Sequence, residues 1–532
     1  MSVMTPYRSA LSAGRDGFAQ LLHSEWTKFR TVRGWVIGMI VAVLVTAGFG
    51  VLGSGTSQSS CQQVGSGGTG PVRHGGACTP SFPLGPGGEP VTDSFYFVHQ
   101  QLTSGGSITV RLASMTGLLS PPNSPAPNPT QPGLEEWAKA GIIIKSSLTQ
   151  GSAYASMMVA AGHGVRMQWN YTGDTAGLSG AVGPANPRWL RLTRSGDVIT
   201  GYDSADGTHW TEVGAVTLTG LPRTVQAGLF ATSPGENQES QNFGGGVSSG
   251  GGGPTQATAT FDQVSGLGGA WAGEFIGGAD ASGLGSYHQA AGRFTVTGSG
   301  DIAPIPAGHG GELDSAATIA DYLLGTFLGL IALGVIAAMF MTAEYRRSLI
   351  RNTLAASPRR GRVLVAKAVV VAAVSFVVGL AGSALAVLVG GAITHARGYY
   401  EYPVSGMTEV KVIVGTGLFA AVAAVFALAI GAITRRGATA VVGVIVAIVL
   451  PYFLAVSAAV PLGVGDWLLR ITPAAGFALQ SAYPRYDQVT DIIYSPLSGY
   501  YPLSWWAGLL VLCAWTAAAL CVAGYLLRRR DA

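Results

Sequence analysis

Six apolar stretches, each close to 20 residues long or longer, decide the fold class of this 532-residue chain. A helix needs about 20 apolar residues to cross the hydrocarbon core of a bilayer. Charged residues make up only 11% of the chain, whereas soluble domains carry about 25%. The sequence therefore predicts a polytopic α-helical membrane protein with six transmembrane helices, at residues 35–53, 318–342, 364–394, 412–434, 438–462 and 505–527.

Basic residues predict how these helices are oriented. The N-terminal arm (1–34), the loops after the second and fourth stretches, and the C-terminal tail together carry seventeen basic and four acidic residues. Cytoplasmic segments are rich in Lys and Arg, so we expect both termini in the cytoplasm of a multi-pass plasma-membrane protein. The first stretch could be a cleaved signal peptide, but the 34 residues before it favour a retained anchor.

The segment between the first two helices, residues 54–316, is predicted to lie outside the cell and has ten basic against seventeen acidic residues. Residues 165–171 alternate strictly between apolar and polar side chains, as a half-buried strand does. Asp206-Gly207 marks a hairpin turn. Similar short runs predict an extracellular all-β sandwich over about residues 91–303, with strands at 107–113, 140–145, 165–171, 189–194, 197–202, 210–218, 225–231, 257–261 and 293–298.

Three features of the outside segment lie between or before these strands. The Pro-rich residues 120–131 and the Gly/Ser-rich residues 244–254 are expected to be loops or linkers. Cys61 and Cys78 are the two cysteines outside the membrane stretches. A disulfide between them is predicted in an oxidising compartment, with two free thiols in a flexible stretch as the alternative.

Residues 18–32 are predicted to form an amphipathic helix at the membrane interface, since Phe18, Leu22, Trp26 and Phe29 fall on one side. Glu25 falls within this apolar side, where an unpaired carboxylate is costly. Two alternatives remain open for it. It has a buried partner, or it snorkels to water.

The loop at residues 344–363 carries a second amphipathic pattern. Pro358 would end a short helix at about Ser357, on which Arg347 and Arg351 are an i,i+4 basic pair beside an apolar side made by Leu349, Ile350 and Leu354. This arrangement suits docking on a soluble partner. The alternative is a positive-inside loop, which explains the charges but not their arrangement.

No catalytic or metal-binding set is apparent from the sequence. The chain lacks the G-x-x-x-x-G-K-[ST] loop that cradles ATP phosphates, so ATP-driven work would need another subunit. The G-x-G-x-x-G match at 48–53 and the G-x-S-x-G match at 246–250 lack the flanking strand and helix that these motifs require. Asp321, near the outer edge of the second stretch, is expected to have a capping or interface role.

The membrane half resembles permeases of the type 2 ABC exporter class. Residues 21–32 (LLHSEWTKFRTV) and 344–367 (EYRRSLIRNTLAASPRRGRVLVAK) carry the resemblance. It implies an interfacial helix at 18–32 and a coupling helix at 344–357 that seats on the ATPase. It also implies short outer helices before the last span, matching residues 464–501. The ATPase-coupling residues are then Glu344, Arg346, Arg347, Leu349, Ile350, Arg351 and Leu354.

The same resemblance implies the partners. Two ABC ATPase subunits would bind ATP and Mg, no cofactor would be bound by this chain, and a second permease chain would complete the pore as a homodimer or heterodimer. The lipid bilayer is the remaining partner, and no nucleic acid is expected. The 263-residue insert departs from the short first loop common in this family.

The insert itself, at residues 91–266, resembles concanavalin-like, laminin-G-like sandwiches. The segments that carry this resemblance are 93–98, 106–111, 137–142, 189–192 and 206–211. Residues 294–302 (FTVTGSGDI) resemble the strand that usually opens such a domain, which here would close it from the C-terminal side. Sugar binding by Arg166, Gln168 and Tyr202 is one hypothesis, and a scaffold without a ligand is the alternative.

Together these patterns predict the permease subunit of an ATP-driven exporter, powered by a separate ATPase and not itself an enzyme. The substrate is left open among amphipathic, lipid, peptide and drug-like molecules. The alternative is a membrane-anchored extracellular glycan or envelope sensor. One span would suffice for such an anchor, so six spans with an ordered basic loop favour transport.

Overall fold

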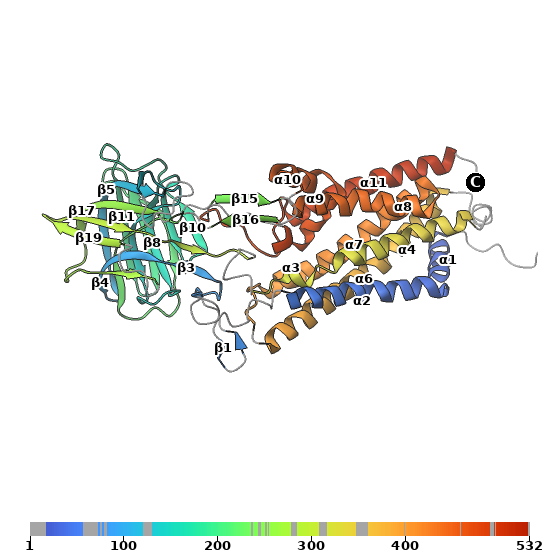
Figure 1. The fold of residues 1–532 in the computed structure, drawn as a ribbon, viewed down its shortest axis with the longest axis horizontal. Helices are drawn as coiled ribbons and strands as arrows, with labels where there is room; N and C mark the ends of the chain where they lie inside the picture. The colour runs from blue at the N-terminus through green and yellow to red at the C-terminus, as the bar shows by residue number, and fades with distance from the viewer. Residues whose placement is uncertain are drawn as a thin grey trace, which may run out of the picture.

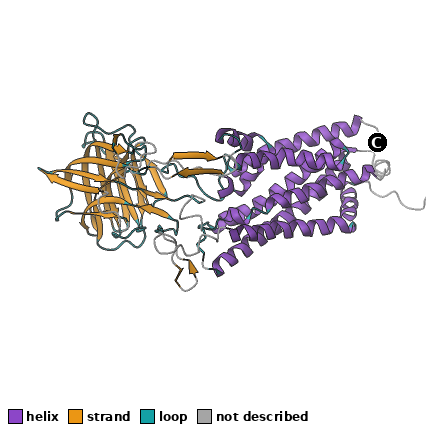
Figure 2. Ribbon diagram, viewed as in Figure 1, coloured by secondary structure: helices purple, strands orange, loops and turns teal. Residues whose placement is uncertain are grey.

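The chain folds into a β-sandwich and a bundle of apolar helices (Figure 1), and Figure 2 shows the strands and helices segregated into these two parts. The helix α1 lies at the end of the bundle away from the sandwich (Figure 1). The computed structural model describes residues 17–56, 73–74, 77–78, 82–120, 130–235, 238–242, 246–250, 253, 255–277, 285–307, 316–346, 360–397, 399–457, 459–489, 494 and 496–529.

All six apolar stretches form helices long enough to cross a membrane, as the sequence predicts. Ahead of them lies the separate amphipathic helix α1 (Phe18–Thr31). The helix α6 starts four residues earlier than its apolar stretch, because helix continues through basic residues into the expected loop. The spans are α2 (Arg33–Thr56), α3 (Ile319–Tyr322) with α4 (Thr326–Arg346), α6 (Arg360–Ala396), α7 (Gly406–Thr434), α8 (Gly437–Val444) with α9 (Leu450–Val456), and α11 (Trp505–Arg529).

Two of the spans are interrupted helices, which hydropathy does not predict. The second span breaks between α3 and α4, where a Cβ on Gly325 would lie 2.0 Å from the Thr46 carbonyl oxygen of α2. Close approach of two helix backbones needs glycine at such a point. The fifth span contains a π-helical turn, η3 (Ile445–Val449), just before Pro451. Proline cannot supply the N–H of a regular helical bond, so the backbone pattern changes there.

Short helices occupy the segment before the last span, where the family resemblance implied them. They are α10 (Leu462–Ile471), the 3-10 helix η4 (Pro473–Gln480) and the 3-10 turn η5 (Pro496–Ser498). Every residue of η4 is buried, and η4 packs against α7 and α11. The Thr472 side chain caps η4 by accepting a hydrogen bond from Ala474 N. A polar, proline-interrupted segment is thus folded back into the helical bundle.

The sandwich consists of two antiparallel sheets that pack face to face. Its core joins Ile142, Met157 and Leu229 of one sheet to Leu192 and Phe261 of the other. The first sheet has the order β10 (Gly173–Ala176), β9 (Gly164–Trp169), β8 (Tyr154–Ala160), β7 (Lys139–Lys145), β14 (Val225–Thr232), β4 (Phe95–Leu102) and β18 (Ala272–Ile276). The second has β13 (Thr211–Thr217), β12 (Val198–Ser204), β11 (Arg188–Ser195), β5 (Gly105–Leu119), β17 (Gln256–Ser265), β20 (Arg293–Gly298) and β19 (Gly285–Ala290), with β6 (Gln131–Pro132) beside β5.

All nine predicted strands are present, and the turn at Asp206-Gly207 lies between β12 and β13, with a positive φ of 79° at Gly207. The strand β8 was missed, although β7, whose seven residues are also all buried, was predicted. The expected strand at residues 294–302 corresponds to β20, which lies between β17 and β19 in the second sheet. After it, β21 (Ile302–Pro304) pairs with β3 (Val91–Asp93) in a separate two-stranded sheet.

The Gly/Ser-rich stretch was wrongly expected to be only a loop or linker. Part of it forms β16 (Gly246–Gly250), which pairs with β15 (Gln238–Asn242). A strand pair rests on backbone hydrogen bonds, which glycine and serine can make as well as other residues.

The predicted disulfide remains a prediction, because Cys61 lies outside the described residues and only the backbone of Cys78 is described, in β2 (Ala77–Cys78) beside β1 (Arg73–His74). We expect mass spectrometry of the non-reduced protein to recover one linked pair of peptides containing these cysteines. Cys513 and Cys521 of α11 are free and serve as internal controls for alkylation. Two further alkylatable thiols in protein from intact cells would contradict the prediction.

Candidate functional site

A buried cluster of four charges joins α1, α4 and α6 at the end of the bundle away from the sandwich. The Lys367 Nζ of α6 donates to Glu25 Oε2 of α1 at 2.6 Å and to Glu344 Oε1 of α4 at 2.8 Å. Lys28 Nζ reaches the same two residues, at 2.7 Å from Glu25 Oε1 and 3.1 Å from Glu344 Oε1. The Lys367 and Glu25 side chains are fully buried. Two acidic and two basic groups thus compensate one another, with Glu25 and Lys367 shielded from water and Lys28 partly exposed to it.

This cluster resolves the alternatives left open for Glu25, since the carboxylate has a buried partner and does not snorkel to water. Burial lowers the pKa of Lys28, but the Glu25 and Glu344 carboxylates outweigh that effect and raise it above its ordinary value. Aromatic rings seal the site on one side. Lys367 Nζ lies 4.3 Å from the centre of the Phe340 ring, which also packs edge-on against Phe29 at 5.4 Å.

The predicted interfacial residues divide between two surroundings. Leu22, Glu25 and Phe29 contact the bundle, so one side of α1 packs against protein. Trp26 is 42% exposed, and Phe18 is half-buried. At about 100° per residue, Phe18 falls on the packed side between Glu25 and Phe29, whereas Trp26 lies at the edge of that side.

The predicted coupling residues start inside a membrane helix. Glu344 and Arg346 belong to the last turn of α4, because helix continues past the apolar stretch. Arg347, Leu349, Ile350, Arg351 and Leu354 lie outside the described residues. Glu344 is thus the predicted coupling residue whose contacts are described, and they run to α1 and α6.

At the opposite end of the bundle, tyrosine side chains bind the two chain segments that lead to the sandwich. Tyr400 OH donates to Gly88 O at 2.6 Å, and Tyr402 OH donates to Ile305 O. Tyr500 OH accepts from Ala307 N at 3.0 Å. Asp321 has the capping role that the sequence suggested, since its carboxylate accepts from Thr318 N and Oγ1 at 2.8 Å.

Two buried lysines on the sandwich hold the same two segments. Lys145 Nζ donates to Asp93 Oδ2 of β3 at 2.6 Å, and Lys139 Nζ donates to Asp301 Oδ1, just before β21, at 2.6 Å. Burial lowers the pKa of Lys145, although Asp93 opposes that effect. A third contact comes from the segment between η4 and η5, where Gln488 Nε2 donates to Tyr171 O at 3.0 Å.

The residues proposed for sugar binding do not share one surface. Arg166 and Gln168 belong to β9 of the first sheet, and both donate to Asp174. Tyr202 belongs to β12 of the second sheet. Because core residues alternate with these positions on both strands, the first two lie on the outer side of one sheet and Tyr202 on the outer side of the other. A ligand contacting all three is therefore excluded.

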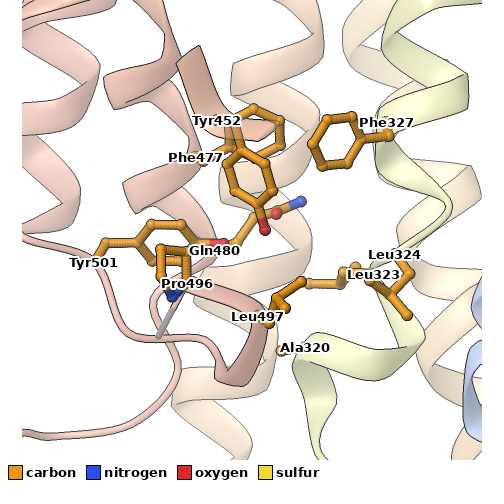
Figure 3. A pocket seen from close by; sticks show the side chains of 10 residues that line it. All are labelled: Ala320, Leu323, Leu324, Phe327, Tyr452, Phe477, Gln480, Pro496, Leu497 and Tyr501. Atoms are coloured by element: carbon orange, nitrogen blue, oxygen red, sulfur yellow. The ribbon is translucent and has the colours of Figure 1, made fainter. Parts of the chain in front are cut away.

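A small pocket lies within the bundle between α3, α4, α9, η4 and η5 (Figure 3). Its aromatic walls are in close contact, with ring centres 4.2 Å apart for the tilted pair Tyr452 and Phe477 and 4.6 Å apart for the edge-on pair Phe327 and Tyr452. The enclosed volume is about 10 Å³, which is room for one water molecule. Tyr501 lines both this pocket and a wider cavity of about 280 Å³ that contains Arg485.

Sequence reasoning missed Lys367 as a site residue and missed this pocket altogether. Lys367 was counted only among the basic residues of the loop, although a lysine four residues into an apolar stretch is a usable signal for a buried partner. No local signal marks Phe327, Tyr452 or Phe477, because aromatic residues are common in any membrane helix.

Comparison with known proteins adds a family match over part of the chain. Residues 311–454 match the model of a family described as ABC-2 family transporter protein. No curated protein was found to match the chain.

Solved structures resemble part of this chain only distantly. A functionally unknown protein from Saccharomyces cerevisiae is 15% identical, with 38% of this chain and 92% of that chain covered and a TM-score of 0.22. The peptidase SCP-B of the Eqolisin family is 8% identical, with 40% and 100% covered and a TM-score of 0.23. Likenesses at these scores carry no argument. The six apolar helices indicate a multi-pass membrane protein, and residues 311–454 of its helical part are similar to ABC-2 family transporter proteins.

Proposed function

We propose that this chain is the membrane-spanning permease subunit of an ATP-driven exporter in the plasma membrane. The observation that carries the proposal is the buried cluster of Glu25, Glu344 and Lys367. It ties the amphipathic helix to two spans, directly before the segment whose sequence suits docking on an ATPase. The family match over residues 311–454 supports the same assignment.

In this proposal the ATPase binds ATP and Mg, and the permease converts the movement of the ATPase into movement of helices. The segment after Glu344 seats on the ATPase. Because Glu344 is bound to α1 and α6 through Lys367, a displacement of that segment moves three helices together. The helix α4 extends from Glu344 to Phe327 in the aromatic pocket, so the same displacement reaches the pocket walls.

The remaining parts of the assembly follow from the charge pattern and the family resemblance. Two ATPase subunits and a second permease chain complete the transporter. Both termini lie in the cytoplasm, and the sandwich, a concanavalin-like scaffold, lies outside. Loops rich in arginine at the end of the bundle that carries α1 support this orientation.

Affinity purification of the tagged chain in mild detergent tests the proposal. We expect an ATPase to co-purify in equal amount, and its ATP hydrolysis to change when the permease is bound. Recovery of the folded chain without any nucleotide-binding protein, from several detergents, would contradict the proposal and favour the sensor alternative.

Removing residues 91–303 with a short linker is expected to leave membrane insertion and ATPase association intact. The deletion removes β3 and the first two residues of β21 but keeps Gly88 and Ile305, whose carbonyl oxygens accept the tyrosine hydrogen bonds. Co-purification with the ATPase measures the result, and fluorescence-detected gel filtration checks that the shortened chain is monodisperse. If a correctly inserted, monodisperse deletion variant lost the ATPase, the sandwich would be structurally required.

A further inference from the structure

The aromatic pocket contains one amide side chain, that of Gln480 at the end of η4. This side chain is only 6% exposed and extends into the space between Tyr452 and Phe327 (Figure 3). A buried amide is costly unless its polar atoms are satisfied. The partners of Gln480 therefore indicate what the pocket accepts.

The nitrogen of the amide is fully assigned. Gln480 Nε2 donates to Thr326 Oγ1 at 3.1 Å and to Thr416 Oγ1 at 3.2 Å. Thr416 Oγ1 donates its own proton to Val412 O at 2.9 Å, so toward Gln480 it can act only as an acceptor. This network favours the assigned amide orientation, because a flipped amide would place its oxygen against Thr416 Oγ1, whose proton is already donated to Val412 O.

The oxygen of the amide has no partner among the described residues. Gln480 Oε1 accepts no hydrogen bond from any of them, and it is partly accessible to solvent. The two threonines thus hold an acceptor open toward a pocket otherwise lined by aromatic rings and by aliphatic side chains such as Leu323 and Leu497. A molecule that meets this site gains most when it offers an O–H or N–H beside a flat apolar body.

The pocket must open to admit anything larger than water. The helix that carries Tyr452, one of its walls, is irregular just before that residue. The π-helical turn η3 and Pro451 immediately precede Tyr452. Both features interrupt the regular hydrogen bonds that hold a helix straight. A rotation of α9 there separates Tyr452 from Phe327 and Phe477. The cavity of about 280 Å³ beyond Tyr501 provides the adjoining space.

We propose that Gln480 is the specificity-determining acceptor of a binding site for flat, largely apolar molecules that carry a hydroxyl or N–H donor. Binding at this site is independent of the ATPase. The statement that such molecules are the exported substrates rests on the function proposed above.

Two probes that differ in one donor test the site: 1-naphthol and 1-methoxynaphthalene. The full chain in lipid nanodiscs is dialysed against each, and binding to empty nanodiscs is subtracted. We expect the affinity of the wild-type chain for the naphthol to be at least about five-fold higher than its affinity for the methyl ether, because one hydrogen bond is added. Comparing this ratio among variants cancels differences in lipid partitioning.

Three variants identify the residue responsible. Gln480→Met keeps the length of the side chain but removes the acceptor, and should abolish the preference. Thr416→Val keeps Gln480 but releases its amide, and should reduce the preference. Gln488→Met, in the same segment but outside the pocket, should leave it unchanged. Thr416→Val also keeps the test decisive if Gln480→Met does not fold.

An equal ratio of naphthol to methyl ether binding in the wild type and both pocket variants would overturn the inference. The absence of binding above that of empty nanodiscs would also overturn it, and would mean that Gln480 holds a water molecule only. A donor preference without a co-purifying ATPase would contradict the proposed function while supporting the site. A co-purifying ATPase without any preference for the donor would support the proposed function and contradict the site.

Discussion

Replacing Lys367 with methionine is expected to destabilise the protein by about 3–5 kcal/mol, the usual effect of breaking a buried ion pair on one side. Lys367→Met leaves the buried Glu25 and Glu344 carboxylates with only Lys28 to balance them. Methionine fills much of the same volume, so the loss comes from charge and hydrogen bonds. Thermal unfolding in detergent, followed by gel filtration of heated samples, measures the effect.

Lys28→Met is the matched control, because Lys28 binds the same two carboxylates but is 40% exposed. Water screens such a pair, so we expect a loss of about 1 kcal/mol or less. A triple variant that adds Glu25→Gln and Glu344→Gln to Lys367→Met removes the stranded charges and should recover most of the stability. Equal effects of the two lysine variants would mean that burial of the cluster has no energetic role.

Reversing the charge of two loop residues, Arg347→Glu and Arg351→Glu, is expected to weaken association with the ATPase by several tens-fold or more. The apolar side made by Leu349, Ile350 and Leu354 would supply contact, and the two arginines would supply charge-assisted hydrogen bonds of about 1.5–3 kcal/mol each. Binding and stimulated ATP hydrolysis, measured on the same detergent preparation, test the prediction.

The control for this variant is Arg528→Glu with Arg529→Glu in the last turn of α11. It makes the same change in net charge on the same predicted side of the membrane. We expect nearly normal ATPase association, because these residues are not in the proposed coupling segment. Normal association of the Arg347 and Arg351 variant as well would mean that those charges serve topology alone.

Much of the architecture could be predicted from the sequence because its signals are local. A membrane helix must satisfy its own backbone hydrogen bonds and carry an apolar surface, so a run of apolar residues is enough to identify it. The strand β11 buries every second residue, and both β9 and β11 reveal themselves by alternation of residue type along the sequence. Where both sides are buried that signal is lost, and of two such strands β7 was predicted while β8 was missed.

The position of Glu25 on the apolar side of its helix predicted that its carboxylate either has a buried partner or snorkels to water. Which one holds depends on Lys367, which is 342 residues away in the chain. The residue pattern of either helix alone does not predict this contact, because it forms only when α1 and α6 pack together.

From the sequence alone come the six helices, the β-rich insert between the first two, and the amphipathic character of α1, since each depends on the order of side chains within one segment. Only the tertiary structure decided the rest. It separated Arg166 from Tyr202 on opposite outer faces of the sandwich. It also placed Thr326, Thr416 and Gln480 together. These arrangements depend on packing between distant segments, where a contact is specified by shape and hydrogen bonding in three dimensions.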